Sequence, residues 1–364
     1  MAEATDRSAA NSGTRDVRDT HRFDVSRLDA WLQDNVDDYA GPLSVEQFKG
    51  GQSNPTYKLV TPGQNYVLRR KPPGQLLPGA HAVDREYRVI HALGAQGFPV
   101  PKTFGLCLDE EVIGTAFYVM EMVEGRIFWD PAFPQVEDTD RPVYFDAMND
   151  VIAALHTLDP GSIGLADYGK PGNYFERQIG LWSKQYLGDV EAGRVAAMDR
   201  LVEWLPANIP PAPEAAAEET RVIHGDFRCD NMIFHPHEPR VIAVLDWELS
   251  TLGHPLADFS YHAMMYRMPA ALFSGLAGLD LGALNIPSEA DYIAAYCRRT
   301  GRDSIPDFDF YIAFNMFRLA AILHGIKGRL ARGNAASDHA GKMVEGLDAL
   351  AELAWQQAVR AGAR

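Results

Sequence analysis

The chain has 364 residues, and its 34 Lys and Arg against 49 Asp and Glu give a formal net charge of −15 with histidine neutral. Apolar residues make up 46% and charged residues 23%, which is ordinary globular composition and excludes a disordered or fibrous chain. The acidic balance argues against a nucleic-acid-binding surface, and the length favours two domains or lobes.

The first third of the chain predicts a small antiparallel sheet that carries one helix. Residues 1–22 are polar and mixed in charge, which is typical of a disordered tail. A helix with Ser26 as its cap is predicted over Ser26–Val36. Five strands and a second helix follow, with glycine-rich turns between the first three strands. The strands are predicted at Val45–Lys49, Thr56–Val60, Tyr66–Arg70, Thr103–Leu108 and Ala116–Met122, and the helix at residues 82–96.

After Gly125 the pattern becomes mainly helical, so we expect a tail over residues 1–22, a first lobe over 23–124 and a second lobe over 125–364. Residues 206–219 form a Pro- and Ala-rich surface segment, and long helical patterns run from Pro255 to the end. Between these two regions lie three short strand patterns. The predicted elements of this part are helices at Val143–Leu158, Tyr174–Gly188 and Met198–Leu205 and strands at Arg221–His224, Asn231–Phe234 and Val241–Leu245.

Candidate chemistry is concentrated around the three short strands. His224-Gly225-Asp226 is followed by Asn231, and Asp246-Trp247-Glu248 comes directly after the apolar run Val241–Leu245. A strand that ends in a carboxylate fixes the backbone and leaves the acid exposed to a metal ion. Phosphoryl transfer needs a base for the attacking hydroxyl, hard oxygen ligands for Mg²⁺, and cations on the phosphates. The oxygens can come from Asp226, Asn231, Asp246 and Glu248.

The segments His224–Asn231 and Asp246–Glu248 together resemble the protein-kinase-like fold, in its aminoglycoside phosphotransferase and choline kinase branch. Gly225 follows that branch, in which glycine replaces the arginine of protein kinases. The resemblance implies an α+β fold with two lobes, a small antiparallel-sheet N-lobe and a mainly helical C-lobe. It also implies a phosphotransferase that uses ATP and Mg²⁺ and has an alcohol group as acceptor. No A-P-E segment follows Asp246, which argues against a protein kinase.

The same resemblance implies a role for each residue of the second-lobe motifs. Asp226 accepts or orients the proton of the substrate hydroxyl. Asn231 and Asp246 bind Mg²⁺, and Glu248 adds a ligand directly or through water. Arg228, two residues after the catalytic aspartate, contacts the γ-phosphate.

Several neighbouring residues are expected to serve the fold rather than the chemistry. The resemblance implies that Asp258 buttresses the catalytic loop by hydrogen bonds and that His224 is a structural prop of this loop. His156 is interpreted as a packed histidine at a helix end, and Trp247 as a core aromatic residue.

The first lobe can hold the nucleotide-binding parts. Gly50, Gly51, Gln52, Ser53 and Asn54 lie between two predicted strands, and their backbone N–H groups with the Ser53 hydroxyl can cap phosphates. By resemblance, Arg69 takes the place of the strand lysine of protein kinases, and Glu86 on the next helix is its carboxylate partner. Glu121–Val123 would be the hinge that offers backbone groups to adenine. Each of these features alone is common in turns and on surfaces. The evidence for a nucleotide-binding lobe is therefore the order in which the features follow one another along the chain.

A second, closer resemblance indicates the class of substrate. The stretches GGQSNPTY, VLRRKPPG, AHAVDREYR and LDWELSTLGHPLADFSY look like the phosphotransferase domain fused to some animal acyl-CoA dehydrogenases, and like its stand-alone bacterial relatives. This implies phosphorylation of a hydroxyl on a hydroxyacyl-CoA, with an acyl-CoA dehydrogenase as a partner. The alternatives are an aminoglycoside or choline-type kinase, and a non-catalytic nucleotide-binding regulator of an acyl-CoA dehydrogenase.

A basic stretch near the C-terminus bears on the substrate. No Asp or Glu occurs between Asp309 and Asp338. The stretch could form a site for an anionic substrate such as the phosphates of CoA, or a basic helix face paired with acids elsewhere. A cationic substrate would instead favour carboxylates or an aromatic cage. The basic residues are Arg318, His324, Lys327, Arg329 and Arg332.

The cysteines and the apolar runs of the sequence indicate in which cellular compartment the protein lies. Cys107, Cys229 and Cys297 are too scattered for a disulfide framework or a zinc site, and are interpreted as buried apolar residues in a reducing compartment. No apolar run approaches the roughly 20 residues that span a bilayer, and the N-terminus lacks the apolar segment of a secretory signal. The sequence therefore predicts a soluble cytoplasmic protein with no membrane and no nucleic-acid partner.

Overall fold

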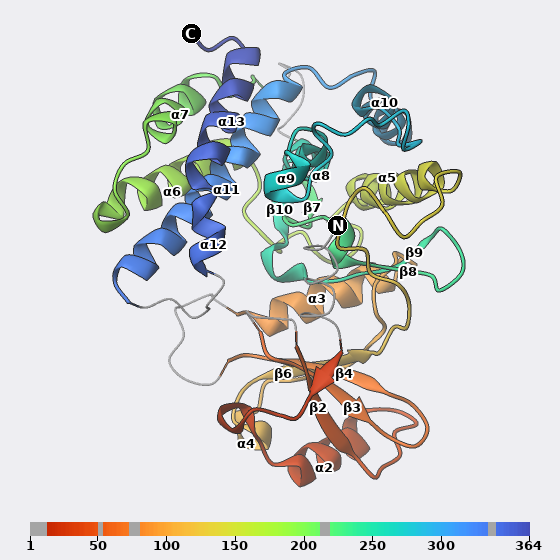
Figure 1. Ribbon diagram of the computed structural model, residues 1–364. Coiled ribbons are helices and arrows are strands. Elements are labelled where there is room, and N and C mark those ends of the chain that lie inside the picture. The colour runs from red at the N-terminus through yellow and green to blue at the C-terminus, as the bar shows by residue number, and fades with distance from the viewer. Residues whose placement is uncertain (1–12, 50–53, 73–80, 212–218, 334–339) are drawn as a thin grey trace. The chain divides into compact units, whose positions relative to one another are not determined.

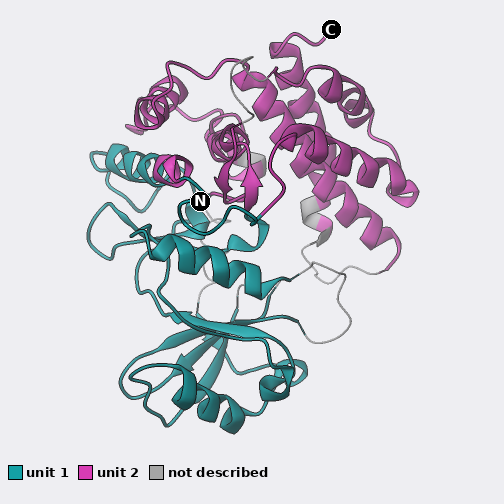
Figure 2. Ribbon diagram, turned by 180° about the vertical axis from the view of Figure 1, so that it is seen from behind, with its two compact units in different colours: residues 1–151, 159–168, 228–250 teal, residues 152–158, 169–227, 251–364 magenta. Residues whose placement is uncertain are grey.

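The computed structural model describes residues 13–49, 54–72, 81–211, 219–333 and 340–364 (Figure 1). Residues 50–53 of the expected phosphate loop lie outside the described residues, as do residues 1–12. The chain forms two compact units (Figure 2), of which the first comprises residues 1–151, 159–168 and 228–250 and the second residues 152–158, 169–227 and 251–364. The units therefore divide the chain at other places than residue 124.

The first unit is built on a six-stranded antiparallel sheet in the order β1-β2-β3-β4-β6-β5. Strands β3 and β4 have the predicted bounds, and β2, β5 and β6 differ from theirs by one residue at one or both ends. The short β1 adds an edge before residue 23, although two residues are too few to show an alternating pattern. The strands are β1 (Thr14–Arg15), β2 (Ser44–Phe48), β3 (Thr56–Val60), β4 (Tyr66–Arg70), β5 (Thr103–Cys107) and β6 (Phe117–Glu121).

Helices cover both faces of this sheet (Figure 1). Helix α2 (Val25–Asn35) packs Leu28 and Leu32 into a core with the alternate strand residues of one face, such as Tyr57 and Leu68. Helix α3 (Val83–Gly94) contacts the other face through β5 and β6, and the short α4 (Glu110–Ile113) contacts α2.

The N-cap of α2 corrects a sequence prediction. Asp24, not Ser26, is the cap, because the Asp24 carboxylate accepts hydrogen bonds from the backbone N–H groups of Ser26 and Arg27. Both residue types are good caps, so the sequence alone did not distinguish them.

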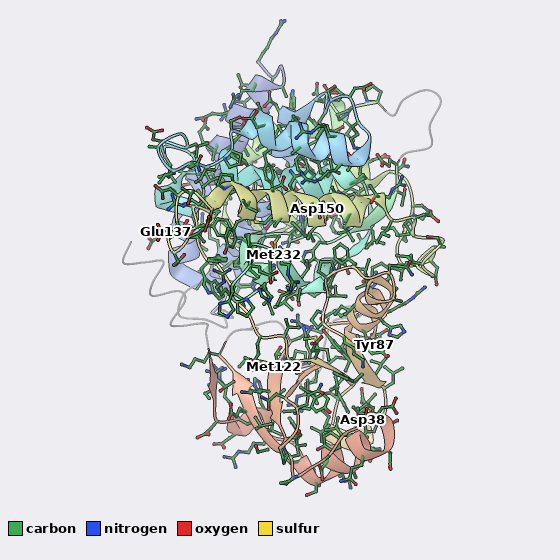
Figure 3. All side chains as sticks on the ribbon, turned by 90° about the vertical axis from the view of Figure 1, so that its right-hand side faces the viewer. Asp38, Tyr87, Met122, Glu137, Asp150 and Met232 are labelled. Carbon is green, nitrogen blue, oxygen red and sulfur yellow. The ribbon has the colours of Figure 1, made fainter. Side chains whose placement is uncertain are left out.

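A two-stranded ribbon completes the first unit. Strands β8 (Met232–Phe234) and β9 (Val241–Val244) pair antiparallel, with Met232 opposite Val244. The Met232 side chain, labelled in Figure 3, is fully buried. The N–H of Val244 donates to the carbonyl of Pro99 at 2.8 Å, which ties the ribbon to the segment between α3 and β5. The ribbon is flanked by the 3-10 turns η3 (Cys229–Asn231) and η4 (Trp247–Leu249).

The second unit is mainly helical and contains a second ribbon, β7 (Arg221–Ile223) paired with β10 (Thr251–Gly253). Helix α11 (Phe308–Ala331) packs against α6, α8 and α13, which explains why it is apolar around most of its circumference. Helix α5 (Arg141–Thr157) begins in the first unit and ends in the second. The other helices are α6 (Tyr174–Gly188), α7 (Ala196–Ala207), α8 (Pro255–Ala263), α9 (Ala270–Phe273), α10 (Glu289–Thr300), α12 (Ala340–Glu345) and α13 (Leu347–Arg360), with 3-10 turns η1 (Asp19–His21), η2 (Val190–Ala192) and η5 (Met264–Tyr266).

Helix α11 contains most of the acid-free basic stretch. Arg332, just after this helix, pairs with Asp189 at 2.7 Å and Glu191 at 3.4 Å. His324 is buried and bonds the carbonyl of Gly193 at 2.7 Å. These contacts support the interpretation of a basic face paired with partners elsewhere in the fold, rather than one continuous anion site. Within the described residues, no helix combines the length and apolar character needed to cross a membrane.

Candidate active site

Arg69 is surrounded by carboxylates in the first unit. Its Nε lies 2.9 Å from Glu86 Oε2, and its Nη2 lies 2.6 Å from Asp246 Oδ1 and 3.3 Å from Glu248 Oε2. These residues come from β4, α3 and the η4 turn, so residues separated by up to 179 positions meet at one guanidinium. The structure therefore brings together the predicted cation, its predicted carboxylate partner and two of the three predicted metal ligands.

Glu86 is held by neutral partners as well as by Arg69. Asn54 donates from Nδ2 to Glu86 Oε1 at 2.7 Å, and the Tyr118 hydroxyl donates to Oε2 at 3.1 Å. Asn54 Oδ1 lies 2.9 Å from His81 Nδ1. Burial raises the pKa of the Glu86 carboxyl to about 7, although the Arg69 guanidinium acts to lower it.

The network gives the Asn54 side chain a role that the sequence did not predict. Its backbone was predicted as part of a phosphate-capping loop, and its fully buried side chain in addition supports Glu86. The loop residues Gly50, Gly51, Gln52 and Ser53 lie outside the described residues.

The β8–β9 ribbon places Asn231 beside Asp246. The backbone N–H of Leu245 donates to the carbonyl of Asn231 at 2.8 Å, which continues the pairing of Met232 with Val244 by one residue. Asp246 therefore leaves the ribbon at the end where Asn231 enters it. This pairing explains why Asn231 and Asp246 lie 15 residues apart in sequence and yet next to each other in space.

The turn after the ribbon orients the two acids. Asp246 has a left-handed backbone conformation with φ 64° and ψ 59°, which is uncommon outside glycine and tolerated by aspartate. Trp247 is buried, and its indole N–H donates to the carbonyl of Val244 at 2.9 Å. This buried position agrees with the interpretation of Trp247 as a core aromatic residue. The two acids on either side of Trp247, Asp246 and Glu248, contact Arg69.

The donor set at the ribbon end fits a hard cation. Two carboxylates and one amide supply oxygen ligands of the kind that Mg²⁺ takes in nucleotide sites. The structure already places a positive group, the Arg69 guanidinium, between Asp246 and Glu248. Among the described residues, no group of three or more His, Cys, Asp or Glu is arranged to hold a metal ion.

Asp226, the residue predicted to accept the substrate proton, belongs to the second unit. It follows β7 and Gly225, which has φ 86° and so requires glycine for this backbone turn. The Tyr261 hydroxyl donates to Asp226 Oδ1 at 2.5 Å, and the Asp226 N–H donates to His224 Nδ1 at 3.2 Å. Both contacts hold Asp226 within its own unit.

Asp258 buttresses this loop, as the resemblance implied. Its two carboxylate oxygens accept the N–H groups of His224 at 2.7 Å and Gly225 at 2.8 Å. His156 Nε2 lies 3.2 Å from Asp258 Oδ2, and its Nδ1 lies 2.8 Å from the Tyr296 hydroxyl. Burial acts to raise the pKa of Asp258, but the bonds to His156 and to the loop outweigh it and lower the pKa below its usual value.

Arg228 and the expected hinge lie in the first unit. Arg228 is half-exposed, and its Nη2 donates to Asp230 Oδ2 at 2.6 Å. At the hinge, the N–H of Glu121 donates to the carbonyl of Lys102 at 2.8 Å. The Val123 backbone, by contrast, makes no hydrogen bond with any other residue in the described part of the chain.

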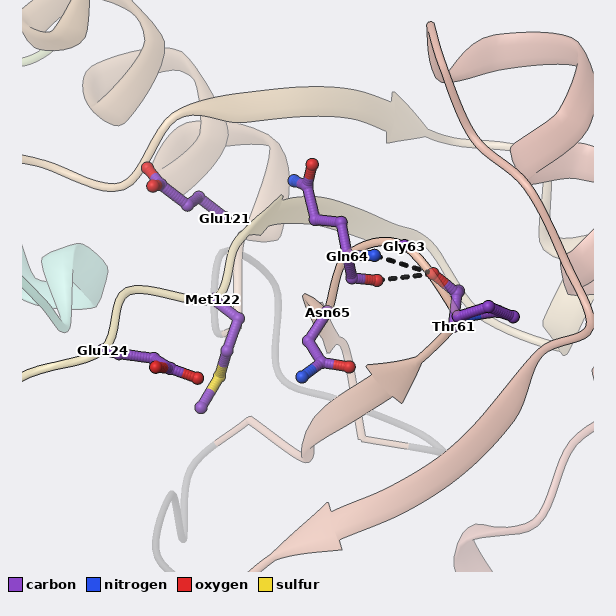
Figure 4. Close-up of a pocket in the computed structure, with 8 residues that line it drawn as sticks. Thr61, Gly63, Gln64, Asn65, Glu121, Met122 and Glu124 are labelled. Atoms are coloured by element: carbon purple, nitrogen blue, oxygen red, sulfur yellow. Dashed lines mark hydrogen bonds between the residues drawn. The ribbon is translucent and has the colours of Figure 1, made fainter.

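A polar pocket of about 450 Å³ borders this hinge (Figure 4). Its walls are the turn between β3 and β4, from Thr61 to Asn65, and the residues Glu121, Met122 and Glu124. The side chains of Met122 and Glu124 lie on one side of the pocket and that of Asn65 on the other (Figure 4).

Sequence reasoning missed several of these residues. Tyr261, Tyr118 and His81 each bond a predicted functional residue, but they lie 27 to 35 positions away from it in sequence. No spacing rule connects residues at such separations. The only available signal was that Tyr261 comes three residues after Asp258 and therefore lies on the same helix face.

Comparison with known proteins agrees with this geometry. The family model described as the phosphotransferase enzyme family (APH) matches residues 44–309. Acyl-CoA dehydrogenase family member 11 of Gallus gallus is 44% identical over 352 residues and member 10 of Mus musculus is 41% identical over 354, covering 94% and 96% of this chain. The chain spans 44% and 33% of the length of these two relatives.

Solved structures share the fold. A protein of Ralstonia eutropha JMP134, provisionally named an aminoglycoside phosphotransferase, is 52% identical with a TM-score of 0.85, over 93% of this chain and 99% of that one. Aminoglycoside phosphotransferase APH(4)-Ia, solved as a ternary complex with ADP and hygromycin B, has a TM-score of 0.58 at 13% identity, over 92% of this chain and 98% of that one. The predicted protein-kinase-like α+β fold is thus confirmed, and the chain belongs to the phosphotransferase enzyme family.

Proposed function

We propose that this phosphotransferase is an ATP-dependent small-molecule kinase that transfers the γ-phosphate to a substrate hydroxyl. The observation that carries the proposal is the Arg69 cluster, in which one buried guanidinium meets Glu86, Asp246 and Glu248 at 2.6 to 3.3 Å. A cation for the phosphates and acids for a metal are the main parts that phosphoryl transfer requires from a protein.

In this proposal Asp226 is the base. Its carboxylate accepts the proton of the substrate hydroxyl, the hydroxyl oxygen forms a bond to the γ-phosphorus, and the bond from that phosphorus to the bridging oxygen of ADP breaks. The backbone bonds from His224 and Gly225 to Asp258 support this role, because they fix the loop from which Asp226 projects.

The nucleotide-binding residues are proposed in the first unit. Arg69, held by Glu86, and Arg228 would contact the phosphates, and the Val123 backbone would contact adenine. The loop Gly50–Asn54 would cover the phosphates through its backbone. Support comes from the buried network around Glu86 and from APH(4)-Ia, which shares the fold and is described in complexes with ADP and AMP-PNP.

Magnesium is proposed to bind through Asn231, Asp246 and Glu248. Bound Mg²⁺ would neutralise charge on the β- and γ-phosphates. Arg69 now contacts both acids, so it would have to share them with the ion. The chain's own contribution is the Leu245–Asn231 backbone hydrogen bond, which brings Asn231 close to Asp246, and the η4 turn, which carries Glu248.

For the substrate we propose a hydroxyacyl-CoA. The support is that relatives at 41% and 44% identity, which cover nearly all of this chain, are named acyl-CoA dehydrogenase family members. Those relatives are more than twice as long as this chain, which makes an acyl-CoA dehydrogenase a reasonable partner to test. An aminoglycoside is the second candidate, because the solved relative at 52% identity carries that provisional name.

One assay separates these candidates. The protein is incubated with Mg-ATP and either 4-hydroxyacyl-CoA thioesters or a panel of amino sugars and choline, and ADP release is measured. We expect turnover with the CoA thioesters and its loss, by a factor of at least about 10³, in Asp226→Asn. Turnover only with amino sugars or choline would overturn the substrate, and ATP binding by calorimetry without turnover on any acceptor would favour the non-catalytic regulator.

A further inference from the structure

We propose that Tyr261 is a positioning residue for the catalytic base, a role that rests on the proposed function of Asp226. The Tyr261 hydroxyl donates to Asp226 Oδ1 at 2.5 Å, across 35 residues of sequence. Both residues belong to the second unit. The torsion that turns an aspartate carboxylate about its own axis is broad and weakly restrained. A hydrogen bond to one oxygen therefore selects one orientation of the group.

The helix that carries Tyr261 is itself tied to the catalytic loop. Asp258 lies one turn earlier on α8 and accepts the N–H groups of His224 and Gly225. His262, next to Tyr261, bonds the carbonyl of Phe227 through Nδ1 at 3.2 Å. Helix α8 thus holds the backbone before and after Asp226, while Tyr261 holds its side chain.

Arg318 on α11 contacts both the Tyr261 ring and the catalytic loop. Its guanidinium carbon lies 5.5 Å from the ring centroid, and its Nη2 donates to the carbonyl of Gly225 at 3.0 Å. The Arg318 side chain is buried, with 8% of the residue exposed. A buried cation that contacts both the loop and the ring accounts for one basic residue of the acid-free stretch that the phosphate chemistry does not use.

Tyr261 and His224 contact different parts of Asp226. The Tyr261 hydroxyl donates to the carboxylate oxygen Oδ1, and His224 Nδ1 accepts the backbone N–H. The Arg318 guanidinium lies over the Tyr261 ring. A hydrogen bond to one carboxylate oxygen restrains the direction in which the group is presented to an alcohol.

The first test is the steady-state kinetics of Tyr261→Phe, which keeps the ring under Arg318 and removes only the hydroxyl. We expect kcat to fall by about 10- to 100-fold, the range for loss of one hydrogen bond to a charged group. KM for ATP and for the acceptor should stay within about twofold. A fall in kcat with both KM values unchanged is a pattern that a merely structural loss does not produce.

The matched control is Tyr311→Phe. Tyr311 lies on α11 in the same unit and is also buried, but its hydroxyl makes no hydrogen bond with any described residue. We expect this variant to keep the kcat and the KM values of the unmodified protein. An equal fall in kcat in both variants would overturn the assignment to Tyr261.

A second measurement does not depend on activity. With ¹³C-labelled aspartate, the carboxyl signal of Asp226 is assigned by its loss in Asp226→Asn and followed against pH. At every pH we expect its chemical shift to differ between Tyr261→Phe and the unmodified protein, because the carboxylate has lost a hydrogen-bond donor, and to be the same in Tyr311→Phe. An unchanged signal in Tyr261→Phe overturns the inference even if no acceptor is phosphorylated, whereas a changed signal with no turnover overturns only the proposed function.

The contribution of Arg318 is tested by a double-mutant cycle. Arg318→Lys keeps the charge but loses the flat guanidinium over the ring. If Arg318 acts through Tyr261, its effect on kcat should be smaller in the Tyr261→Phe background than in the unmodified protein. Equal effects in both backgrounds would show that Arg318 does not act through Tyr261.

Discussion

His262 connects the catalytic loop to helix α10 through both of its ring nitrogens. Nδ1 lies 3.2 Å from the carbonyl of Phe227, and Nε2 lies 2.7 Å from the hydroxyl of Tyr292. A carbonyl only accepts, so Nδ1 carries the proton and Nε2 accepts from the tyrosine. This arrangement requires a neutral ring, and burial lowers the pKa of His262 to about 4.

This lowered pKa predicts a loss of stability in acid. The unfolded chain binds a proton at His262 near pH 6.5, and the folded protein only near pH 4, so the free energy of unfolding falls as the pH falls through this window. We expect a loss of about 2 kcal/mol between pH 7 and pH 5 from this residue. Urea unfolding at both values measures it, and His262→Asn should show a smaller difference. The same difference in both proteins would contradict the prediction.

The single residues also show what the sequence could reveal about the site. Asp226, Asn231 and Asp246 can be predicted as site residues because they stand in a motif with fixed local spacing. Arg69 and Glu86 can be predicted because they follow each other along one strand and the next helix. Tyr261 and Asn54 act across a distance in sequence, and only the packing of α8 and of the sheet shows which groups they touch.

At the level of elements, Gly125 decides how the β8–β9 ribbon attaches to the rest of its unit. A Cβ atom at this position would lie 2.3 Å from the carbonyl oxygen of Phe234 and 2.5 Å from a methyl group of Ile233. The next residue, Arg126, exchanges backbone hydrogen bonds with Phe234 at 2.8 Å. The ribbon and the segment after β6 can approach this closely only because residue 125 has no side chain.

Gly125→Ala should therefore destabilise the protein. The clash is with backbone, so the ribbon has to move, and we expect a loss of about 2–4 kcal/mol in the free energy of unfolding. The control is Gly180→Ala on α6, where an added Cβ meets nothing within 4 Å. That variant should gain about 0.5–1 kcal/mol, because alanine favours helix. Denaturant unfolding of both variants checks the contrast, and losses of similar size would refute the argument from close approach.

The elements differ in how much of them the sequence could predict. Strands β3 and β4 and helix α6 have the predicted bounds. The turn residues Thr61, Pro62 and Gly63 separate the two strands, and Gly188 ends the helical pattern of α6. The partners of the basic residues on α11 were not predictable, since Arg332 pairs with Asp189 across 143 positions. Two acceptable caps for α2 stand two residues apart, and only the observed hydrogen bonds to Asp24 distinguish them.

At the scale of the whole molecule, the chain passes from the second unit to the first between residues 227 and 228, which is inside the motif His224–Asn231. Asp226 lies at the end of one segment of the second unit, and Asn231 lies near the start of a segment of the first. Only four residues separate the proposed base from the proposed metal ligand. We expect a nucleotide that binds at the proposed site to raise the stability of the folded chain.

This expectation gives a prediction for ligand binding. A ligand that binds only the folded state stabilises it by about 2.7 kcal/mol at 100 times its Kd. We expect Mg-ATP to raise the midpoint of thermal unfolding, and ATP with EDTA to raise it less, because the phosphates then lack the charge that neutralises them. In Asp246→Asn the difference between these two conditions should vanish, since a neutral amide replaces a metal-binding carboxylate at the ribbon end.

The control for this measurement is Asp34→Asn, an exposed acid on α2 with no bond to the Arg69 cluster. It should keep the full difference between Mg-ATP and ATP with EDTA. If Asp246→Asn also kept that difference, Asp246 would not bind the ion. Its contact with Arg69 would then serve to hold the guanidinium in place, and the metal would have to bind through other oxygens.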